Sequence, residues 1–159
     1  QVPSVQASFV SMDPTDGAIH ALIGGFDFGL SKFNHITQGY RQPGSTIKPF
    51  IYSAAMEKNR MNPNSVVDDK PIKIGSWQPK NADGRYLGPI PLSTALASSR
   101  NMVSIRLLQS IGNDYFRSYA ERFGFEGKRI DKYLTVALGA IEATPYKIVG
   151  AYGVFANGG

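Results

Sequence analysis

The chain has 159 residues and a formal net charge of +5, and 42% of its residues are hydrophobic. This length and composition are typical of one globular domain with its own core and exclude a disordered chain. The chain has no cysteine and only 2 histidines, so disulfides and thiolate metal sites are excluded and a histidine-rich metal site is disfavoured. We therefore expect neither a metal nor a cofactor.

The basic residues are scattered along the chain and form no block of like charge. Nucleic-acid binding usually requires a basic patch, often interleaved with aromatic side chains, and we expect none here. No stretch approaches the roughly 20 apolar residues of a membrane span, and no signal peptide is visible. Membrane attachment would require an anchor outside this sequence.

The first segment predicts an antiparallel β-hairpin. Residues 5–12 are rich in strand formers, and Gln1-Val2-Pro3 before them resembles the start of a strand. Residues 13–17, Asp-Pro-Thr-Asp-Gly, predict a turn, because proline presets φ and Asp-Gly accepts a positive φ. Residues 18–23 predict the second strand. We expect His20 to be an ordinary strand residue without a catalytic role.

Residues 41–50, Arg-Gln-Pro-Gly-Ser-Thr-Ile-Lys-Pro-Phe, predict a loop that leads into a helix. Proline is tolerated only in the first helical turn, so Pro49 indicates a helix start at about Ser45. The helix should run to about residue 58 and be buried on more than one side. Positions i and i+3 share a helix face, so the Ser45 and Lys48 side chains can touch.

This pair of residues can perform nucleophilic catalysis. A serine hydroxyl needs a base beside it, and a lysine is a base when burial or positive surroundings lower its pKa. The N–H groups at a helix N-terminus can hold an oxyanion. A lone S-x-x-K motif is nevertheless expected about once by chance in a chain of this size. The alternative is that Ser45 is an N-cap and Lys48 a solvated side chain.

Residues 59–91 predict a long irregular segment, because prolines and glycines recur throughout it. Such a segment is either a wall or lid beside a cleft or a packed surface excursion. The rest of the chain predicts four helices and a short apolar segment at 134–139. The helices are expected at 93–98 with Ser93 as N-cap, and at 102–109 closed by Gly112. Two more are expected at 114–123, capped by Asn113 and stopped by Gly124, and at 145–156, capped by Thr144.

The order of several short motifs resembles one known family. Ser45-Thr46-Ile47-Lys48 is followed by Ser99-Arg100-Asn101, and an S-x-x-K helix start followed by S-x-N is typical of penicillin-recognising serine acyltransferases. The surrounding sequence is similar to the transpeptidase domain of class A bifunctional penicillin-binding proteins, with a glycine-rich run typical of the Gram-negative 1a type. The matching stretches are residues 24–28, 33–34, 41–45, 48–50, 77–81, 86–89 and 155–159.

The resemblance implies a role for several residues. Ser45 would attack the D-Ala-D-Ala bond of a peptidoglycan stem peptide, and its backbone N–H would form half of an oxyanion hole. Lys48 would be the general base, and Ser99 would relay a proton to the leaving D-alanine. Asn101 would bind the substrate amide and help to hold Lys48, and Tyr86 would line the cleft. An acceptor amine would then take the acyl group, and β-lactam antibiotics would acylate Ser45. The alternative for Ser99 and Asn101 is helix capping.

The resemblance also implies an α/β (α+β) transpeptidase fold like that of serine β-lactamases, with helices on both faces of an antiparallel sheet. The family's third motif, K-T-G, is absent, since neither Lys128 nor Lys147 is followed by Thr-Gly. We therefore expect residues 1–159 to be the N-terminal portion of a single domain. The remainder of that domain would be a partner. Family membership would place the protein at the periplasmic face of the inner membrane.

Two other functions remain open at this point. A serine β-lactamase would need a group that activates a deacylating water, and none of Glu57, Glu121, Glu126 and Glu142 lies in a sequence context that indicates this role. A catalytically silent penicillin-sensing or scaffold domain would keep Ser45 and Lys48, so the sequence does not separate it from an enzyme. Trp77 and Asn81 match the family's motifs, but nothing in the sequence assigns them a chemical role.

Overall fold

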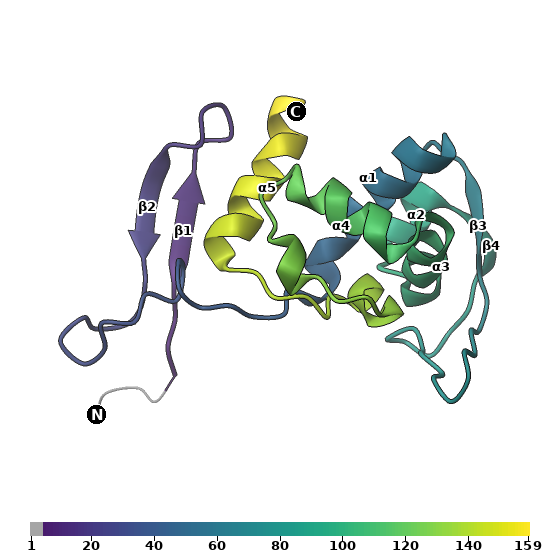
Figure 1. The fold of residues 1–159 in the computed structure, drawn as a ribbon, viewed down its shortest axis with the longest axis horizontal. Helices are drawn as coiled ribbons and strands as arrows, with labels where there is room; N and C mark the ends of the chain where they lie inside the picture. The colour runs from purple at the N-terminus through teal and green to yellow at the C-terminus, as the bar shows by residue number, and fades with distance from the viewer. Residues whose placement is uncertain (1–4) are drawn as a thin grey trace. The chain divides into compact units, whose positions relative to one another are not determined.

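The computed structural model describes residues 5–159, so the strand start predicted at Gln1-Val2-Pro3 lies outside the described residues (Figure 1). The described chain forms two units. The first contains the residues up to Gln42, together with Ala120–Arg129 and Ile141–Gly159; the second contains Pro43–Tyr119 and Ile130–Ala140.

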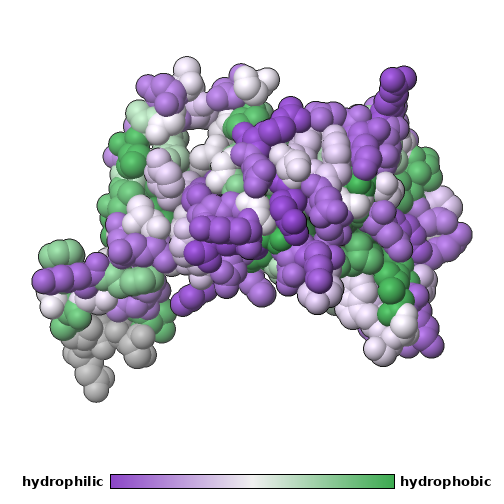
Figure 2. Space-filling model, in the orientation of Figure 1, coloured by the Kyte–Doolittle hydropathy of each residue, from purple (hydrophilic) through white to green (hydrophobic). Residues whose placement is uncertain are grey.

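The predicted hairpin is confirmed in the first unit. Strands β1 (Phe9–Met12) and β2 (Ile19–Ile23) pair antiparallel, with a register irregularity between Ser11 and Met12. In the turn, the Asp13 and Asp16 carboxylates accept hydrogen bonds from backbone N–H groups, and Gly17 has φ +76°. Much of the hairpin's apolar surface faces solvent, including Phe9, Ile19 and Ile23, which are about half exposed (Figure 2).

Helix α5 (Pro145–Asn157) packs beside β1 in the same unit (Figure 1). Thr144 caps it as predicted, because its side chain accepts a hydrogen bond from Lys147 N at 3.3 Å. Gly158 ends the helix with φ 85°. Asn157 Nδ2 donates to the carbonyl of Pro14 at 2.9 Å, which joins the end of α5 to the hairpin turn.

Glu126, beside the 3₁₀ turn η2 (Gly127–Arg129), is the centre of an ionic cluster in this unit. Its carboxylate lies 2.9 Å from Lys147 Nζ and 3.1 Å from Arg129 Nε, and it accepts a hydrogen bond from the Tyr40 hydroxyl at 2.7 Å. These hydrogen bonds, led by that of Lys147, lower the pKa of Glu126 to about 2.

In the second unit, the helix start predicted at Ser45 is wrong by about one turn. Residues Gly44–Ile47 form a 3₁₀ turn, η1, and the α-helix α1 (Lys48–Asn59) begins at Lys48. The cause is Pro49: in an α-helix its N–H would bond the carbonyl of Ser45, but proline has none. Lys48 N donates to that carbonyl instead, and this shorter-range bond defines a 3₁₀ turn.

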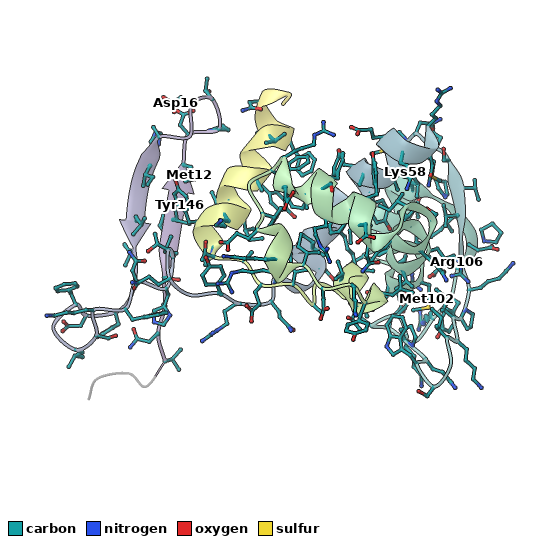
Figure 3. The ribbon with its side chains drawn as sticks, in the orientation of Figure 1. Met12, Asp16, Lys58, Met102, Arg106 and Tyr146 are labelled. Carbon is teal, nitrogen blue, oxygen red and sulfur yellow. The ribbon has the colours of Figure 1, made fainter. Side chains whose placement is uncertain are left out.

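Helices α1 and α3 form the core of the second unit. α1 is buried on more than one side, as predicted, because Phe50, Ile51 and Tyr52 are consecutive and all buried. α3 (Asn101–Ile111) ends at Gly112 and packs on α1 with a nearly continuous buried face. Lys58 Nζ donates to the carbonyl of Ile111 at 2.5 Å, which links the ends of the two helices (Figure 3).

The prediction of irregular structure throughout 59–91 is wrong at two places. Strands β3 (Val66–Asp69) and β4 (Gly88–Pro91) lie within this segment and pair antiparallel. Pro89 and Pro91 concealed β4, because a proline cannot donate to a strand ladder and argues against a central strand. The described pair has two strands only, so each has an edge at which a missing donor costs little.

Two predicted caps are also wrong. α2 (Leu92–Ala97) begins before Ser93, and its first N–H groups, of Leu92 and Ser93, donate to the carbonyls of Ser65 and Pro63 at 2.9 Å each. α4 (Asn113–Glu121) begins at Asn113, whose side-chain amide donates to the carbonyls of Asp131 and Tyr133. In α2, backbone carbonyls thus take the place of a side-chain cap, and in α4 the Asn113 amide is a donor to distant carbonyls.

The short apolar segment predicted at 134–139 is the 3₁₀ turn η3 (Leu134–Leu138), closed by Gly139. The division between the two units falls within α4. Among the described residues, none of the helices has both the length and the hydropathy that a membrane crossing requires.

Candidate active site

Lys48 is the first residue of α1, and its side chain is 1% exposed. Its ammonium group donates three hydrogen bonds: to Ser99 O at 2.7 Å, to Ser99 Oγ at 2.9 Å and to Asn101 Oδ1 at 2.7 Å. A lysine has three N–H donors, so all of them point at the Ser99–Asn101 turn. Within the described part of the chain, none of these bonds reaches Ser45.

Burial lowers the pKa of Lys48 to about 8, and the positive charge of Arg100 adds to the effect. At pH 7 roughly one molecule in ten then carries a neutral lysine, against about one in 2,500 for a lysine with an ordinary pKa. Burial therefore gives Lys48 a neutral fraction that an exposed lysine would lack.

Ser99 has φ +50°, in the left-handed region that residues with a side chain rarely adopt. This conformation turns both its carbonyl and its hydroxyl to Lys48 Nζ. Left-handed backbone at a non-glycine residue costs free energy, and such residues cluster at functional sites. The left-handed backbone of Ser99 therefore accompanies both of its contacts with Lys48 Nζ.

Ser45 lies in η1 and is exposed to solvent. Together with Ser99, Asn101 and residues 81–83, it lines a pocket of about 210 Å³. Gly44 before it has φ +57° and packs against Gly139, where a Cβ atom would lie 2.2 Å from the Gly44 carbonyl oxygen. This contact leaves no room for a side chain at position 139 and fixes the backbone that carries Ser45.

The structure therefore brings four of the five predicted site residues together: Ser45, Ser99 and Asn101 around one pocket, and Lys48 bonded to two of them. Tyr86 is 36% exposed and does not line this pocket, so its role beside the cleft stays a prediction. Among the residues that the structure describes, no glutamate lines the pocket. In the described part of the chain, no group of three or more His, Asp or Glu residues is arranged to hold a metal ion.

Three buried polar residues that the sequence did not assign to the site form a connected group beside it: Asn81 and Arg100 line the pocket, and Asp69 contacts both of them. Asp69 is 0% exposed, Asn81 4% and Arg100 5%. Arg100 Nε lies 2.8 Å from Asp69 Oδ2, and Asn81 Nδ2 donates to Asp69 Oδ1 at 2.8 Å. The only signals in the sequence were the position of Arg100 inside the S-x-N motif and that of Asn81 inside a stretch that matches the family. Neither signal reveals a contact with Asp69.

Comparison with known proteins places this arrangement in a family. The family profile described as "Penicillin binding protein transpeptidase domain" matches residues 7–159. The chain is 52% identical over 166 aligned residues to penicillin-binding protein 1A of Neisseria cinerea and 48% identical over 165 to that of Pseudomonas aeruginosa. Each alignment covers 100% of this chain but only 21% and 20% of the relative, so the chain spans about a fifth of these curated relatives.

A solved structure agrees with the sequence comparison. The crystal structure of penicillin-binding protein 1A from Haemophilus influenzae superposes with a TM-score of 0.90 at 43% identity, over 98% of this chain and 24% of that one. The expected α/β (α+β) transpeptidase fold, present here only in part, is thereby confirmed, and the described residues form helices and small antiparallel sheets. The resemblance read from the sequence motifs is confirmed as well: the chain belongs to the penicillin-binding protein transpeptidase domain family.

Proposed function

We propose that this chain is the N-terminal portion of a peptidoglycan D,D-transpeptidase domain that works through a serine acyl-enzyme. The observation that carries the proposal is the buried Lys48 ammonium, held by Ser99 and Asn101 beside a pocket that Ser45 lines. Family membership and the names of the relatives, penicillin-binding protein 1A, support the same activity.

In the acylation step, Ser45 Oγ attacks the carbonyl carbon of the D-Ala-D-Ala peptide bond and loses its proton to neutral Lys48. The tetrahedral oxyanion accepts a hydrogen bond from the Ser45 backbone N–H. The C–N bond then breaks, and the leaving D-alanine nitrogen receives a proton from the Lys48 ammonium by way of the Ser99 hydroxyl. The products are an acyl ester on Ser45 and free D-alanine.

In the transfer step, an amine of a neighbouring stem peptide attacks the ester carbonyl. A new peptide bond forms, the Ser45 Oγ–C bond breaks, and the amine's proton returns through Lys48 to Ser45. Asn101 would bind the substrate amide, and Tyr86 would border the incoming peptide. A β-lactam would open on Ser45 by the first step and lack an efficient second one.

The proposal includes a contribution from beyond this chain. The family's K-T-G strand would supply the second half of the oxyanion hole and complete the sheet. The domain would act at the periplasmic face of the inner membrane, where stem peptides are cross-linked. The described sheet has β1 and β2 only, so the unpaired backbone edges of these strands would accept the further strands of a larger sheet.

The test is intact-mass spectrometry after incubation with benzylpenicillin, followed by peptide mapping. It is made on a protein of the relatives' full length that contains this chain, and on the chain alone. We expect one adduct on Ser45 in the longer protein and none in its Ser45→Ala variant. A folded longer protein that stays unmodified would overturn the acyl-enzyme proposal.

The fate of the acyl-enzyme separates two related functions from transpeptidation. A serine β-lactamase would release the adduct rapidly, whereas the described lining of the pocket contains no glutamate, which leads us to expect slow release. A sensor or scaffold would be acylated but would not transfer the acyl group to an added amine acceptor. Deacylation rate and transfer to a D-amino acid therefore distinguish the three.

A further inference from the structure

The turn that carries Ser99 and Asn101 leads into α3, and α3 has no cap of its own. Its N-cap residue is Arg100, whose guanidinium cannot accept a hydrogen bond. The acceptor comes instead from Asn81: its Oδ1 accepts from Asn101 N at 2.8 Å and from Met102 N at 3.3 Å. Met102 is labelled in Figure 3. A residue twenty positions earlier thus performs the capping that Ser, Thr, Asp or Asn usually performs locally.

Lys80, the residue before Asn81, helps to fix the Asn101 side chain. Asn101 Nδ2 donates to the carbonyl of Lys80 at 2.8 Å, and Asn101 Oδ1 accepts from Lys48 Nζ at 2.7 Å. Because a carbonyl only accepts and an ammonium only donates, these two partners define which end of the amide faces Lys48. Lys80 and Asn81 therefore hold Asn101 by its side chain and by its backbone.

Asn81 is itself held by a buried polar network. Its Nδ2 donates to Asp69 Oδ1 and to the carbonyl of Arg85, each at 2.8 Å. Asp69 Oδ2 accepts from Arg100 Nε at 2.8 Å and from Leu87 N at 3.0 Å. With two bonds donated and two accepted, the Asn81 amide has no hydrogen bond left to offer a substrate. Fully satisfied buried networks of this kind specify one geometry.

We propose that Asn81 is a positioning residue for acyl transfer: it fixes the start of α3 and, through Asn101 and Ser99, the groups that hold Lys48. This inference rests on the proposed acyl-enzyme function. Loss of the cap would let the Ser99–Asn101 turn shift, and a displacement of about 1 Å in catalytic geometry can lower a rate roughly 100-fold. The contribution lies in the chemical step: Asn81 lines the pocket, but its side-chain amide makes all of its hydrogen bonds within the protein.

The test separates binding from chemistry in the longer protein. Rapid-mixing kinetics with a chromogenic cephalosporin give the first-order acylation constant and the apparent non-covalent binding constant, both normalised to active sites. Asn81→Ala should lower the acylation constant about 10- to 100-fold and leave the binding constant within about twofold. Asn113→Ala is the matched control, because it also removes an asparagine that bonds two backbone carbonyls, those of Asp131 and Tyr133. Its acylation constant should equal that of the wild type.

A reciprocal exchange tests the network without creating a cavity. Asn81→Asp brings a second carboxylate within hydrogen-bond distance of Asp69, and the two acceptors repel. Adding Asp69→Asn restores a donor–acceptor pair between positions 69 and 81 in the reverse direction and keeps the net charge, while the Arg85 carbonyl faces a carboxylate oxygen in both variants that carry Asn81→Asp. The double variant should therefore acylate faster than Asn81→Asp but slower than the wild type, with the rates compared as a double-mutant cycle.

The outcomes are distinct. If the wild type is not acylated, the proposed function fails, whatever the variants do. If the wild type is acylated, three results would overturn the inference. The acylation constant of Asn81→Ala could equal that of Asn113→Ala, or the effects of the two substitutions in the double-mutant cycle could be additive. The variants could also unfold in part while their folded fraction keeps the wild-type acylation constant. A slower chemical step with rescue by the double variant supports it.

Discussion

Gly139 packs directly against Gly44, the residue before Ser45. A Cβ atom at position 139 would lie 2.2 Å from the Gly44 carbonyl oxygen and 2.3 Å from its Cα. Both neighbours are backbone atoms, so the clash cannot be relieved by a side-chain rotation. The backbone of the 3₁₀ turn η1, which carries Ser45, and the backbone at the end of η3 are therefore in direct contact at Gly44 and Gly139.

Gly139→Ala should slow acylation of Ser45 as well as destabilise the fold. The alanine would adopt a left-handed backbone, at a cost of about 1 kcal/mol, and would also push the Gly44 backbone away. We expect a fall of at least about tenfold in the first-order acylation constant, because Ser45 moves with Gly44. Mass spectrometry of quenched time points measures this constant.

Gly158→Ala is the control for that substitution. Gly158 has nearly the same backbone, φ 85° and ψ 8° against φ 87° and ψ 20° at Gly139, but open space where a Cβ would lie. In denaturant, Gly158→Ala should lose only the stability that the left-handed backbone costs, which is less than Gly139→Ala loses, and it should be acylated at the wild-type rate. Equal acylation in both variants would show that the contact with Gly44 does not position Ser45.

The pH dependence of acylation should report Lys48. Burial, with a contribution from Arg100, lowers the pKa of Lys48 to about 8, and only the neutral amine can accept the proton from Ser45. The acylation rate should therefore rise about tenfold per pH unit below pH 8 and level off above it. Lys48→Arg should abolish the reaction throughout, since arginine stays protonated. A rate that does not change between pH 6 and pH 9 would exclude Lys48 as the base.

The elements that the sequence predicted well are those whose signals are local. The hairpin depends on the Asp13–Gly17 turn, and the start of α5 depends on Thr144 and Pro145, so a few adjacent residues carry the information in each case. By contrast, β3 and β4 pair residues that are far apart in sequence, such as Val66 and Pro91, and the prolines of β4 argue locally against a strand. The residues adjacent to either strand therefore do not predict this pairing.

The candidate site divides in the same way. Ser45 and Lys48 lie three residues apart, so a motif could indicate them, although the motif did not show that Pro49 would make the first turn 3₁₀. The lysine's hydrogen bonds go to Ser99 and Asn101, which only the family resemblance linked to it. Asn81 supports the site through contacts far apart in sequence, and such contacts are visible only in three dimensions.

Glu126 should make the first unit sensitive to acid. Its pKa is lowered to about 2 by hydrogen bonds from Lys147, Tyr40 and Arg129, whereas an unfolded glutamate titrates near 4.3. A folded pKa below the unfolded value gives stability that is present above about pH 5 and is lost progressively as pH falls towards 2. Glu126→Gln should therefore lower the melting temperature at pH 7 and reduce its further fall between pH 5 and pH 3.

Thermal unfolding followed by circular dichroism at these pH values measures the effect. Glu121→Gln removes an exposed carboxylate from the same unit and controls for the loss of one negative charge. If Glu126→Gln and the wild type lose melting temperature in parallel as pH falls, the ionic cluster does not contribute to acid sensitivity.

Ser99 has both a hydroxyl that bonds Lys48 and a left-handed backbone, and two substitutions distinguish the effect of the hydroxyl from that of the backbone strain. Ser99→Ala and Ser99→Gly both remove the hydroxyl that bonds Lys48, so both should slow acylation to the same extent, by about 100-fold. Their stabilities should differ, because alanine at φ +50° keeps the left-handed strain and glycine relieves it. We expect Ser99→Gly to be more stable than Ser99→Ala by about 1 kcal/mol in urea unfolding. Wild-type acylation by Ser99→Gly would mean that Ser99 serves only to shape the turn, and that another group carries the proton to the leaving nitrogen.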